Sequence, residues 1–148
     1  MKTSLIATVA FAALLPLGAI AQTLVPGAHF VENWDLDSDG QVTLAEATEK
    51  RGELFYMFDS DENGLLDAAE YQLFDETRQS DMDTNAGGHQ KGAMRGVNQG
   101  LMQAFNDTNG DGQVSEEEFL SQTSDWFAMV DRNDDNLITT DDFGQGNG

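Results

Sequence analysis

The fold of this chain is decided by one stretch of twelve residues, Asp35-Leu36-Asp37-Ser38-Asp39-Gly40-Gln41-Val42-Thr43-Leu44-Ala45-Glu46. Oxygen-bearing side chains stand at its positions 1, 3, 5, 9 and 12, an arrangement that lets a tight loop surround a hard cation with oxygens. Gly40 at position 6 supplies the backbone freedom that a sharp turn requires. The apolar Val42 at position 8 is expected to point into the core. Taken alone, the stretch is also compatible with an acidic surface loop.

The same pattern recurs along the chain at a fixed period. We call the four copies loops one to four: residues 35–46, 59–70, 107–118 and 131–142. Their starts are separated by 24, 48 and 24 residues, which indicates an internal repeat. Loop four departs most, with Asn136 in place of Gly and Asp142 in place of the closing Glu. Four loops in register are a much stronger signal for a cation site than one loop alone.

The longer gap places a missing member of the repeat at residues 83–94. Asp83, Asn85 and Gly88 fit positions 1, 3 and 6, but Met94 stands at the closing position. We interpret this segment as a degenerate fifth loop that has lost its ligands. The alternative is a Gly-rich linker that falls in register by chance, and neither interpretation predicts a bound cation there.

The first 21 residues have the pattern of a secretory signal peptide. Lys2 precedes a mostly apolar run over residues 5–17, and Ala19-Ile20-Ala21 then forms an A-x-A cleavage site before Gln22. The alternative, an uncleaved membrane anchor, is disfavoured because the run is short for a membrane span. The sequence therefore predicts an exported protein, periplasmic or secreted, whose mature domain covers residues 22–148.

The mature domain is strongly acidic and has no cross-links. Cleavage would leave 127 of the 148 residues and, with only Lys2 lost, a formal charge of −21. That charge argues against nucleic acid and membrane surfaces as partners. The chain has no Cys, so disulfides cannot support the domain. Of its 27 acids, 19 lie in the four loops, which argues for cation sites instead of disorder.

Apolar residues flank the loops with helical spacing. Those before the loops are Phe30, Val31 and Trp34; Leu54, Phe55 and Phe58; Leu101 and Phe105; and Trp126, Phe127 and Val130. Those directly after the loops are Ala47, Tyr71, Phe119 and Phe143. Loop three departs from the pattern, because Asn106 directly precedes it. We expect these stripes to form a core; the alternative is a groove that binds a target protein.

The four loops resemble those of the EF-hand superfamily, the calcium-binding fold of calmodulin and of many secreted bacterial proteins. The resemblance covers nearly all of the mature chain. It implies an all-α fold of helix–loop–helix units with short β contacts between paired loops, and up to four Ca²⁺ ions. The implied ligands are Asp35, Asp37, Asp39, Gln41, Thr43 and Glu46; Asp59, Asp61, Asn63, Leu65, Asp67 and Glu70; Asp107, Asn109, Asp111, Gln113, Ser115 and Glu118; and Asp131, Asn133, Asp135, Leu137, Thr139 and Asp142.

The spacing between neighbouring loops predicts an unusual pairing. Only residues 47–58 separate loops one and two, and only residues 119–130 separate loops three and four. One helix shared by two hands fits this spacing, and a helix over 44–58 would be about 20 Å long. Its loops would then lie at opposite ends, so we predict that loop two pairs with loop three and loop one with loop four. The alternative is that Gly52 breaks the first segment into two short antiparallel helices; residues 119–130 contain no Gly, which favours a continuous helix.

Loop four is expected to be the weakest site for Ca²⁺ and the most tolerant of Mg²⁺. Asp142 is one methylene shorter than Glu, so bidentate reach is harder. Asn136 is acceptable at position 6, since Asn visits the left-handed region more easily than most residues.

Two classes of function remain for the whole chain. The first is calcium binding outside the cytoplasm, as a buffer or as a module stabilised by calcium. The second is a calcium-dependent interaction protein that presents Met and aromatic surface to an unidentified protein partner. We do not predict an enzyme, because the only His residues are His29 and His89, and no Ser–His–acid arrangement is present. A dockerin-like module is disfavoured, since three of the four loops end in Glu.

Overall fold

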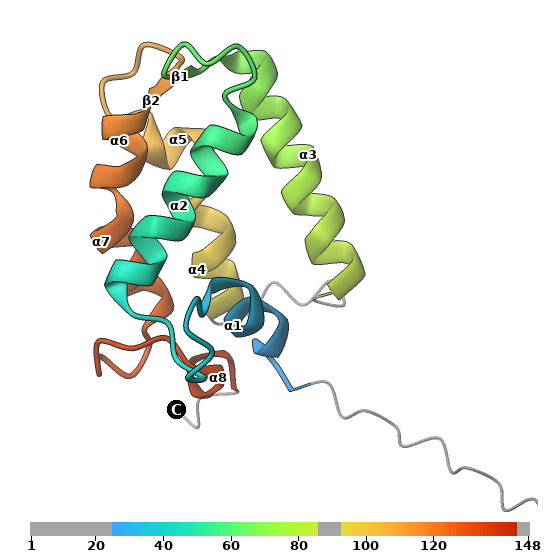
Figure 1. The fold of residues 1–148 in the computed structure, drawn as a ribbon, viewed down its shortest axis with the longest axis vertical. Coiled ribbons are helices and arrows are strands. Elements are labelled where there is room, and N and C mark those ends of the chain that lie inside the picture. Colours follow the sequence, from blue (N-terminus) through green and yellow to red (C-terminus); the bar gives the residue numbers. More distant parts are fainter. Residues whose placement is uncertain (1–24, 86–92, 145–148) are drawn as a thin grey trace, which may run out of the picture.

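The computed structural model describes residues 25–85 and 93–144, and helices dominate this part of the chain. The elements, in chain order, are α1 Ala28–Trp34, α2 Leu44–Phe58, β1 Leu65–Leu66, α3 Ala68–Asn85, α4 Ala93–Gly100, α5 Gln103–Asn106, β2 Val114–Ser115, α6 Glu116–Ser121, α7 Thr123–Val130 and α8 Thr140–Phe143 (Figure 1). The predicted all-α class with short β contacts is confirmed. No helix in the described ranges is long and apolar enough to span a membrane. The predicted signal peptide lies outside these ranges.

The helix α2 runs without a break from loop one to loop two. Its N-terminus is a capping box, in which Thr43 accepts from the backbone N–H of Glu46 and the Glu46 carboxylate accepts from the backbone N–H of Thr43. Its C-cap is Asp59, the first residue of loop two. Gly52 does not interrupt it, so the shared helix over 44–58 is confirmed. Loops one and two therefore lie at opposite ends of α2 (Figure 1).

Replacing Gly52 with Ala is expected to stabilise the protein by about 0.5–1 kcal/mol, because Gly in a helix interior loses more conformational entropy on folding than Ala does. A Cβ at Gly52 would meet no heavy atom within 4 Å. Urea unfolding of both proteins measures the difference in the free energy of unfolding. A lower midpoint for Gly52→Ala would contradict the continuous helix.

The matching helix between loops three and four is broken, so the expectation of a continuous helix over 119–130 is wrong. Gln122 separates α6 from α7 with a ψ of 0°, far from the helical value near −42°. The Thr123 hydroxyl donates a 2.7 Å hydrogen bond to a carbonyl three residues earlier, a contact that competes with the helical pattern. The carbonyl of Phe119 accepts a 2.7 Å hydrogen bond from Arg51 of α2. A sequence without Gly can therefore still break as a helix where side chains donate hydrogen bonds to its backbone carbonyls.

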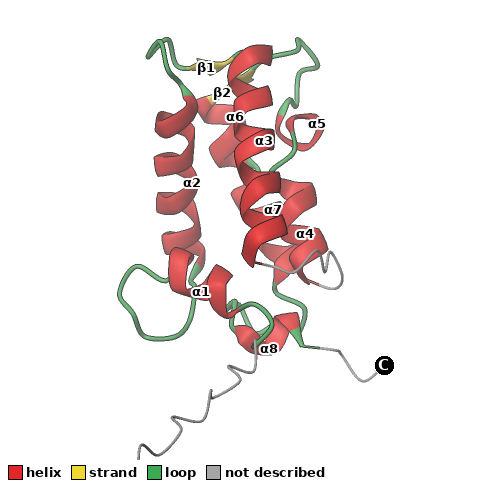
Figure 2. Ribbon diagram, turned by 90° about the vertical axis from the view of Figure 1, so that its right-hand side faces the viewer, coloured by secondary structure: helices red, strands yellow, loops and turns green. Residues whose placement is uncertain are grey.

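The loops pair as the spacing predicts. Strands β1 and β2 are antiparallel with Leu66 opposite Val114, which joins loop two to loop three. An antiparallel bridge between Val42 and Ile138 joins loop one to loop four, with N···O distances of 2.8 and 2.9 Å. All four of these residues stand at position 8, and none is more than 1% exposed. The two loop pairs lie at opposite ends of the helices (Figure 2).

One aromatic core extends between the two loop pairs. Trp126 lies at its centre, with a ring centroid 4.6 Å from that of Trp34. Toward loops two and three, Phe55 packs on Phe119 at 5.9 Å. The buried members of the predicted stripes are Phe30, Val31, Trp34, Ala47, Phe55, Phe58, Tyr71, Leu101, Phe119, Trp126, Phe127, Val130 and Phe143, while Leu54 and Phe105 are partly buried against them. The interpretation of the stripes as core is confirmed.

The proposed fifth loop falls largely outside the described residues. Asp83 and Asn85 lie in the last turn of α3, and Ala93 and Met94 lie in the first turn of α4. Residues 86–92 between these helices are not described. The degenerate-loop interpretation of residues 83–94 therefore stays a prediction.

Candidate metal-binding loops

The first carboxylate of each loop accepts backbone hydrogen bonds from the turn that follows it. In loop one, Asp35 accepts from the N–H of Ser38 at 2.7 Å and from that of Gly40 at 2.7 Å. The bond from position 6 to position 1 occurs in all four loops: Gly40 to Asp35, Gly64 to Asp59, Gly112 to Asp107 and Asn136 to Asp131, at 2.7, 2.9, 3.0 and 2.8 Å. The position-1 carboxylates therefore lie where the backbone N–H groups of each turn converge.

Each loop uses two left-handed residues to make this turn. The position-6 residues Gly40, Gly64, Gly112 and Asn136 have φ of 87°, 79°, 85° and 67°, and the position-4 residues Ser38, Glu62, Gly110 and Asp134 have φ of 63°, 57°, 74° and 58°. The expectation that Asn136 takes the place of Gly is confirmed. Position 4 could not be predicted from composition, because only loop three has Gly there.

The closing acid ties the two ends of each loop together. In loop one, one oxygen of Glu46 accepts from the N–H of Leu36 at 2.9 Å and the other from the N–H of Thr43 at 2.8 Å. Glu70 bridges Ser60 and Asp67, Glu118 bridges Asn109 and Ser115, and Asp142 bridges Arg132 and Thr139 in the same way. The shorter Asp142 thus makes both contacts, at 2.8 and 2.9 Å, and is 1% exposed.

The remaining predicted ligands follow the same repeat. At positions 3 and 5, side-chain oxygens accept from the N–H two residues later: Asp37, Asp39, Asp61, Asn63, Asn109, Asp111, Asn133 and Asp135. The position-7 residues Gln41, Leu65, Gln113 and Leu137 supply the N–H to position 5. The position-9 residues Thr43, Asp67, Ser115 and Thr139 accept from backbone N–H groups in the first turn of the following helix.

Two loops bring three carboxylates close together. Oxygen atoms of Asp35, Asp37 and Asp39 in loop one all lie within 4.8 Å of one another. The same holds for Asp59, Asp61 and Glu70 in loop two. In loops three and four an Asn amide stands at position 3, which reduces the negative charge at that point. This oxygen-only donor set, without Cys or His, fits a hard cation such as Ca²⁺.

The carboxylates of loop one have pKa values shifted in opposite directions. Partial desolvation, followed by the negative charge of Asp39, raises the pKa of Asp37. Desolvation acts in the same direction on Asp35, but its backbone hydrogen bonds together outweigh it and lower the pKa of that carboxyl. The hydrogen bond from the N–H of Thr43 lowers the pKa of Glu46. Neighbouring carboxylates held in their charged forms repel one another, and a divalent cation would relieve that repulsion.

A buried polar cluster beside the loops was not predicted. Arg51 and Asn106 are both fully buried, and Asn106 directly precedes loop three. Two signals in the sequence pointed to it. Arg51 stands four residues after Ala47 and four before Phe55, on the apolar face of α2, and Asn106 occupies a position where the other loops have Trp, Phe or Val.

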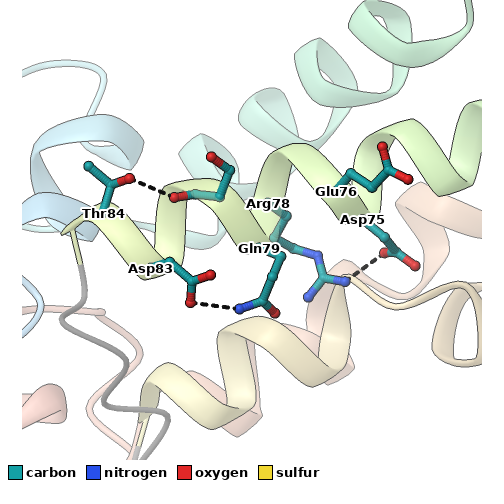
Figure 3. Close-up of a pocket in the computed structure, with 7 residues that line it drawn as sticks. Asp75, Glu76, Arg78, Gln79, Asp83 and Thr84 are labelled. Atoms are coloured by element: carbon teal, nitrogen blue, oxygen red, sulfur yellow. Dashed lines mark hydrogen bonds and ion pairs between the residues drawn. The ribbon is translucent and has the colours of Figure 1, made fainter.

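A shallow hollow of about 560 Å³ runs along α3, away from the four loops (Figure 3). The residues that line it all lie between Asp75 and Thr84 of α3. Arg78 in its middle is held by Asp75 at 2.6 Å and by the carbonyl of Asn98 at 3.3 Å. We interpret this face as solvated helix surface, because its charged groups are already paired along the helix.

The comparisons with known proteins agree with this geometry at one loop. Residues 105–121 match the family model described as EF hand. The matched segment contains the end of α5, all of loop three and the whole of α6. No curated protein and no solved structure matches the chain. The match covers one of the four loops and supports an EF hand, and with it calcium binding in general, at loop three.

Proposed function

We propose that this is an exported protein that binds Ca²⁺ with all four loops, as a calcium buffer or as a module stabilised by calcium. The observation that carries the proposal is the repetition of one hydrogen-bond pattern. In every loop, position 1 accepts from position 6 and the closing acid bridges both ends. Loops one, two and four thus have the internal geometry of loop three, the segment that matches the EF-hand model. The role is one of binding, not of catalysis.

The chemistry of the mature chain supports this role. Four Ca²⁺ ions would reduce its formal charge from −21 to −13. Because there is no Cys, calcium would supply the support that disulfides give to other small exported domains. Extracellular calcium modules bind at about 10⁻⁴ to 10⁻³ M, which matches calcium levels outside cells.

Isothermal titration calorimetry of residues 22–148 tests the proposal. We expect about four equivalents of Ca²⁺ per chain, with affinities in the range of about 10⁻⁴ to 10⁻³ M or tighter. A repeat in millimolar Mg²⁺ identifies sites that accept both ions. Absence of binding at millimolar calcium would contradict the proposal, and one equivalent would restrict it to loop three.

A calcium-dependent interaction role is the second candidate, favoured by exposed apolar side chains. Tyr56 and Met57 at the end of α2 are 64% and 67% exposed, and Leu73 of α3 is 51% exposed. A dye that reports apolar surface, added with and without calcium, separates the two roles. A marked rise in dye fluorescence with calcium favours the interaction role, and no change favours the buffer.

Replacing Asp142 with Glu is expected to tighten Ca²⁺ at loop four and to lower its relative preference for Mg²⁺, because the extra methylene extends the reach of the carboxylate. The Asp142 carboxylate already spans from the N–H of Arg132 to that of Thr139. Competition titration of calcium against magnesium measures the effect. The reverse change in loop one, Glu46→Asp, is the matched control and should weaken its calcium. An unchanged titration for Asp142→Glu would count against the ranking of the sites.

A further inference from the structure

A charged side chain crosses the core midway between the two loop pairs. Arg51 of α2 is 0% exposed and donates to three acceptors: Asn106 Oδ1 at 2.6 Å, the carbonyl of Phe119 at 2.7 Å and that of Gly100 at 3.2 Å. Its guanidinium lies over the Phe119 ring, 4.2 Å from the centroid. Each of these acceptors is neutral, so the charge is held by dipoles and an aromatic face.

Asn106 extends this contact into a network. Its amide donates to the Tyr71 hydroxyl at 3.1 Å and to the carbonyls of Gly100 and Met102 at 3.2 and 2.9 Å. The Tyr71 hydroxyl in turn donates to the carbonyl of Leu101 at 2.7 Å. The carbonyls of Gly100 and Leu101 lie at the end of α4, where helical carbonyls lack backbone partners, whereas the carbonyl of Met102 also accepts from the backbone N–H of Phe105 at 3.1 Å. Arg51 and its partners thus cap α4 from inside the core.

The members of the network stand directly beside the loop ligands. Asn106 precedes Asp107, the first residue of loop three, and Phe119 follows its closing acid. Tyr71 directly follows Glu70, the closing acid of loop two. The network therefore touches both flanks of loop three and the exit of loop two, which together form one loop pair.

Arg51 also lies beside the residues that support the other loop pair, formed by loops one and four. Its guanidinium carbon lies 5.3 Å from the centroid of the Trp126 ring, and that ring packs against Trp34 at 4.6 Å. Trp34 directly precedes loop one, and α7, which carries Trp126, ends directly before loop four. In addition, α2 begins at loop one and ends at loop two. Arg51 is thus the point at which the supports of both pairs meet.

Burial does not remove the charge of Arg51. Desolvation lowers the pKa of its guanidinium to about 10, so the side chain stays protonated near neutral pH. A buried charge must keep its hydrogen-bond partners, because losing one leaves it uncompensated. A displacement of α2 relative to loop three is therefore resisted more strongly than it would be by apolar contacts alone.

We propose that Arg51 is a positioning residue that couples the two loop pairs, so that calcium at loops one and four strengthens calcium binding at loops two and three. The proposal rests on the proposed function. Binding at loop one fixes the first turn of α2, and the Arg51 network transmits that order to the flanks of loop three. Coupling between sites requires a shared structural element that both sites bias, and α2 with its buried arginine is that element.

The test measures how loop one affects loops two and three, with and without Arg51. The reporters are the backbone N–H groups of Gly64 and Gly112, which donate to the first carboxylates of their loops. Their NMR shifts are followed in calcium titrations of residues 22–148. Glu46→Gln disables loop one and is introduced into the parent protein and into the Arg51→Met variant. The methionine has a volume similar to that of the arginine but carries no charge and no hydrogen-bond donors.

In the parent protein, Glu46→Gln is expected to weaken calcium at both reporters by about fivefold or more, the usual scale of coupling between sites. In the Arg51→Met background the same change should have less than about a twofold effect on either reporter, since the coupling is lost. If Arg51 had only a structural role, Glu46→Gln would weaken calcium binding at the reporters by the same factor in both backgrounds. That result would overturn the proposal. Arg51→Lys keeps the charge but not the planar fork and should restore the coupling only in part.

A second variant keeps the test valid if Arg51→Met alone does not fold. Arg51→Met combined with Asn106→Leu gives loop three the apolar residue that precedes the other loops, and replacing a buried polar group together with its partner by apolar side chains is often tolerated. This variant should also show no coupling. If the parent protein shows no calcium shift at either reporter, the proposed function itself fails; shifts with unchanged coupling contradict only the role of Arg51.

Discussion

Millimolar calcium is expected to raise the melting temperature of residues 22–148 by roughly 10 °C or more above its value in chelator. At about 1 mM calcium, a site with a Kd of about 10⁻⁴ to 10⁻³ M stabilises the folded state by roughly 0.4–1.4 kcal/mol. Four such sites give about 2–6 kcal/mol, a large share of the stability of an ordinary domain.

The physical reason lies in the loops without a cation. Carboxylate oxygens of Asp35, Asp37 and Asp39 lie within 4.8 Å of one another, and like charges at such distances repel one another. Loop one also forms the N-terminal cap of α2, through the capping box of Thr43 and Glu46. Repulsion in the loop therefore acts directly on the helix that both loop pairs share.

Differential scanning calorimetry with chelator and with 1 mM calcium, a concentration of about the extracellular level, makes the measurement. Glu46→Gln should reduce the calcium-dependent rise. Glu53→Gln is the matched control, because Glu53 is an exposed acid on α2 that pairs with Lys50 outside the loops, and it should leave the rise intact. Identical melting in chelator and in calcium would rule out calcium as a support of the fold.

Replacing Gly100 with Ala is expected to destabilise the protein by about 1–3 kcal/mol or more, the usual effect of overpacking a core. A Cβ at Gly100 would overlap the ring of Trp126, which is fully buried and donates from Nε1 to the carbonyl of Val97 at 3.3 Å. The helix α4 would have to move away from α7. That movement would also disturb the Gly100 carbonyl, which accepts from Arg51 and Asn106.

Urea unfolding compares Gly100→Ala with Gly52→Ala, the same substitution in open space on α2. The two changes should have opposite signs, a loss of stability at Gly100 and a gain at Gly52. Equal stability of Gly100→Ala and the parent protein would contradict the close packing of α4 on α7. Near-ultraviolet circular dichroism adds a direct view of the Trp126 environment.

The loops and their pairing could be predicted because the required chemistry is local. Position 6 needs a residue that tolerates the left-handed region, and position 8 needs an apolar side chain for the β contact. Both requirements are therefore visible in the sequence of each loop. The pairing of Val42 with Ile138 across the whole chain followed from helix length alone. Residues 47–58 fit one helix shared by two loops, and such a helix places loops one and two at its opposite ends.

The break at Gln122 and the Arg51 network could not be predicted, because they depend on contacts between distant segments. The carbonyl of Phe119 accepts from Arg51, which lies 68 residues earlier in the chain. No local sequence pattern near Gln122 predicts that contact. Asn106 was visible as an exception to the apolar pattern. Arg51 was visible as a charge on the apolar face of α2, but its hydrogen bond to Asn106, and that of Asn106 to Tyr71, become apparent only when α2, α3 and α5 are brought together.

A crystal structure of residues 22–148 grown with calcium chloride would show directly whether all four loops hold calcium. We expect one Ca²⁺ in each of the four loops, held by oxygen ligands at about 2.3–2.6 Å, with loop two beside loop three and loop one beside loop four. Loops without calcium at millimolar concentration, or sequential loops lying side by side, would contradict this expectation.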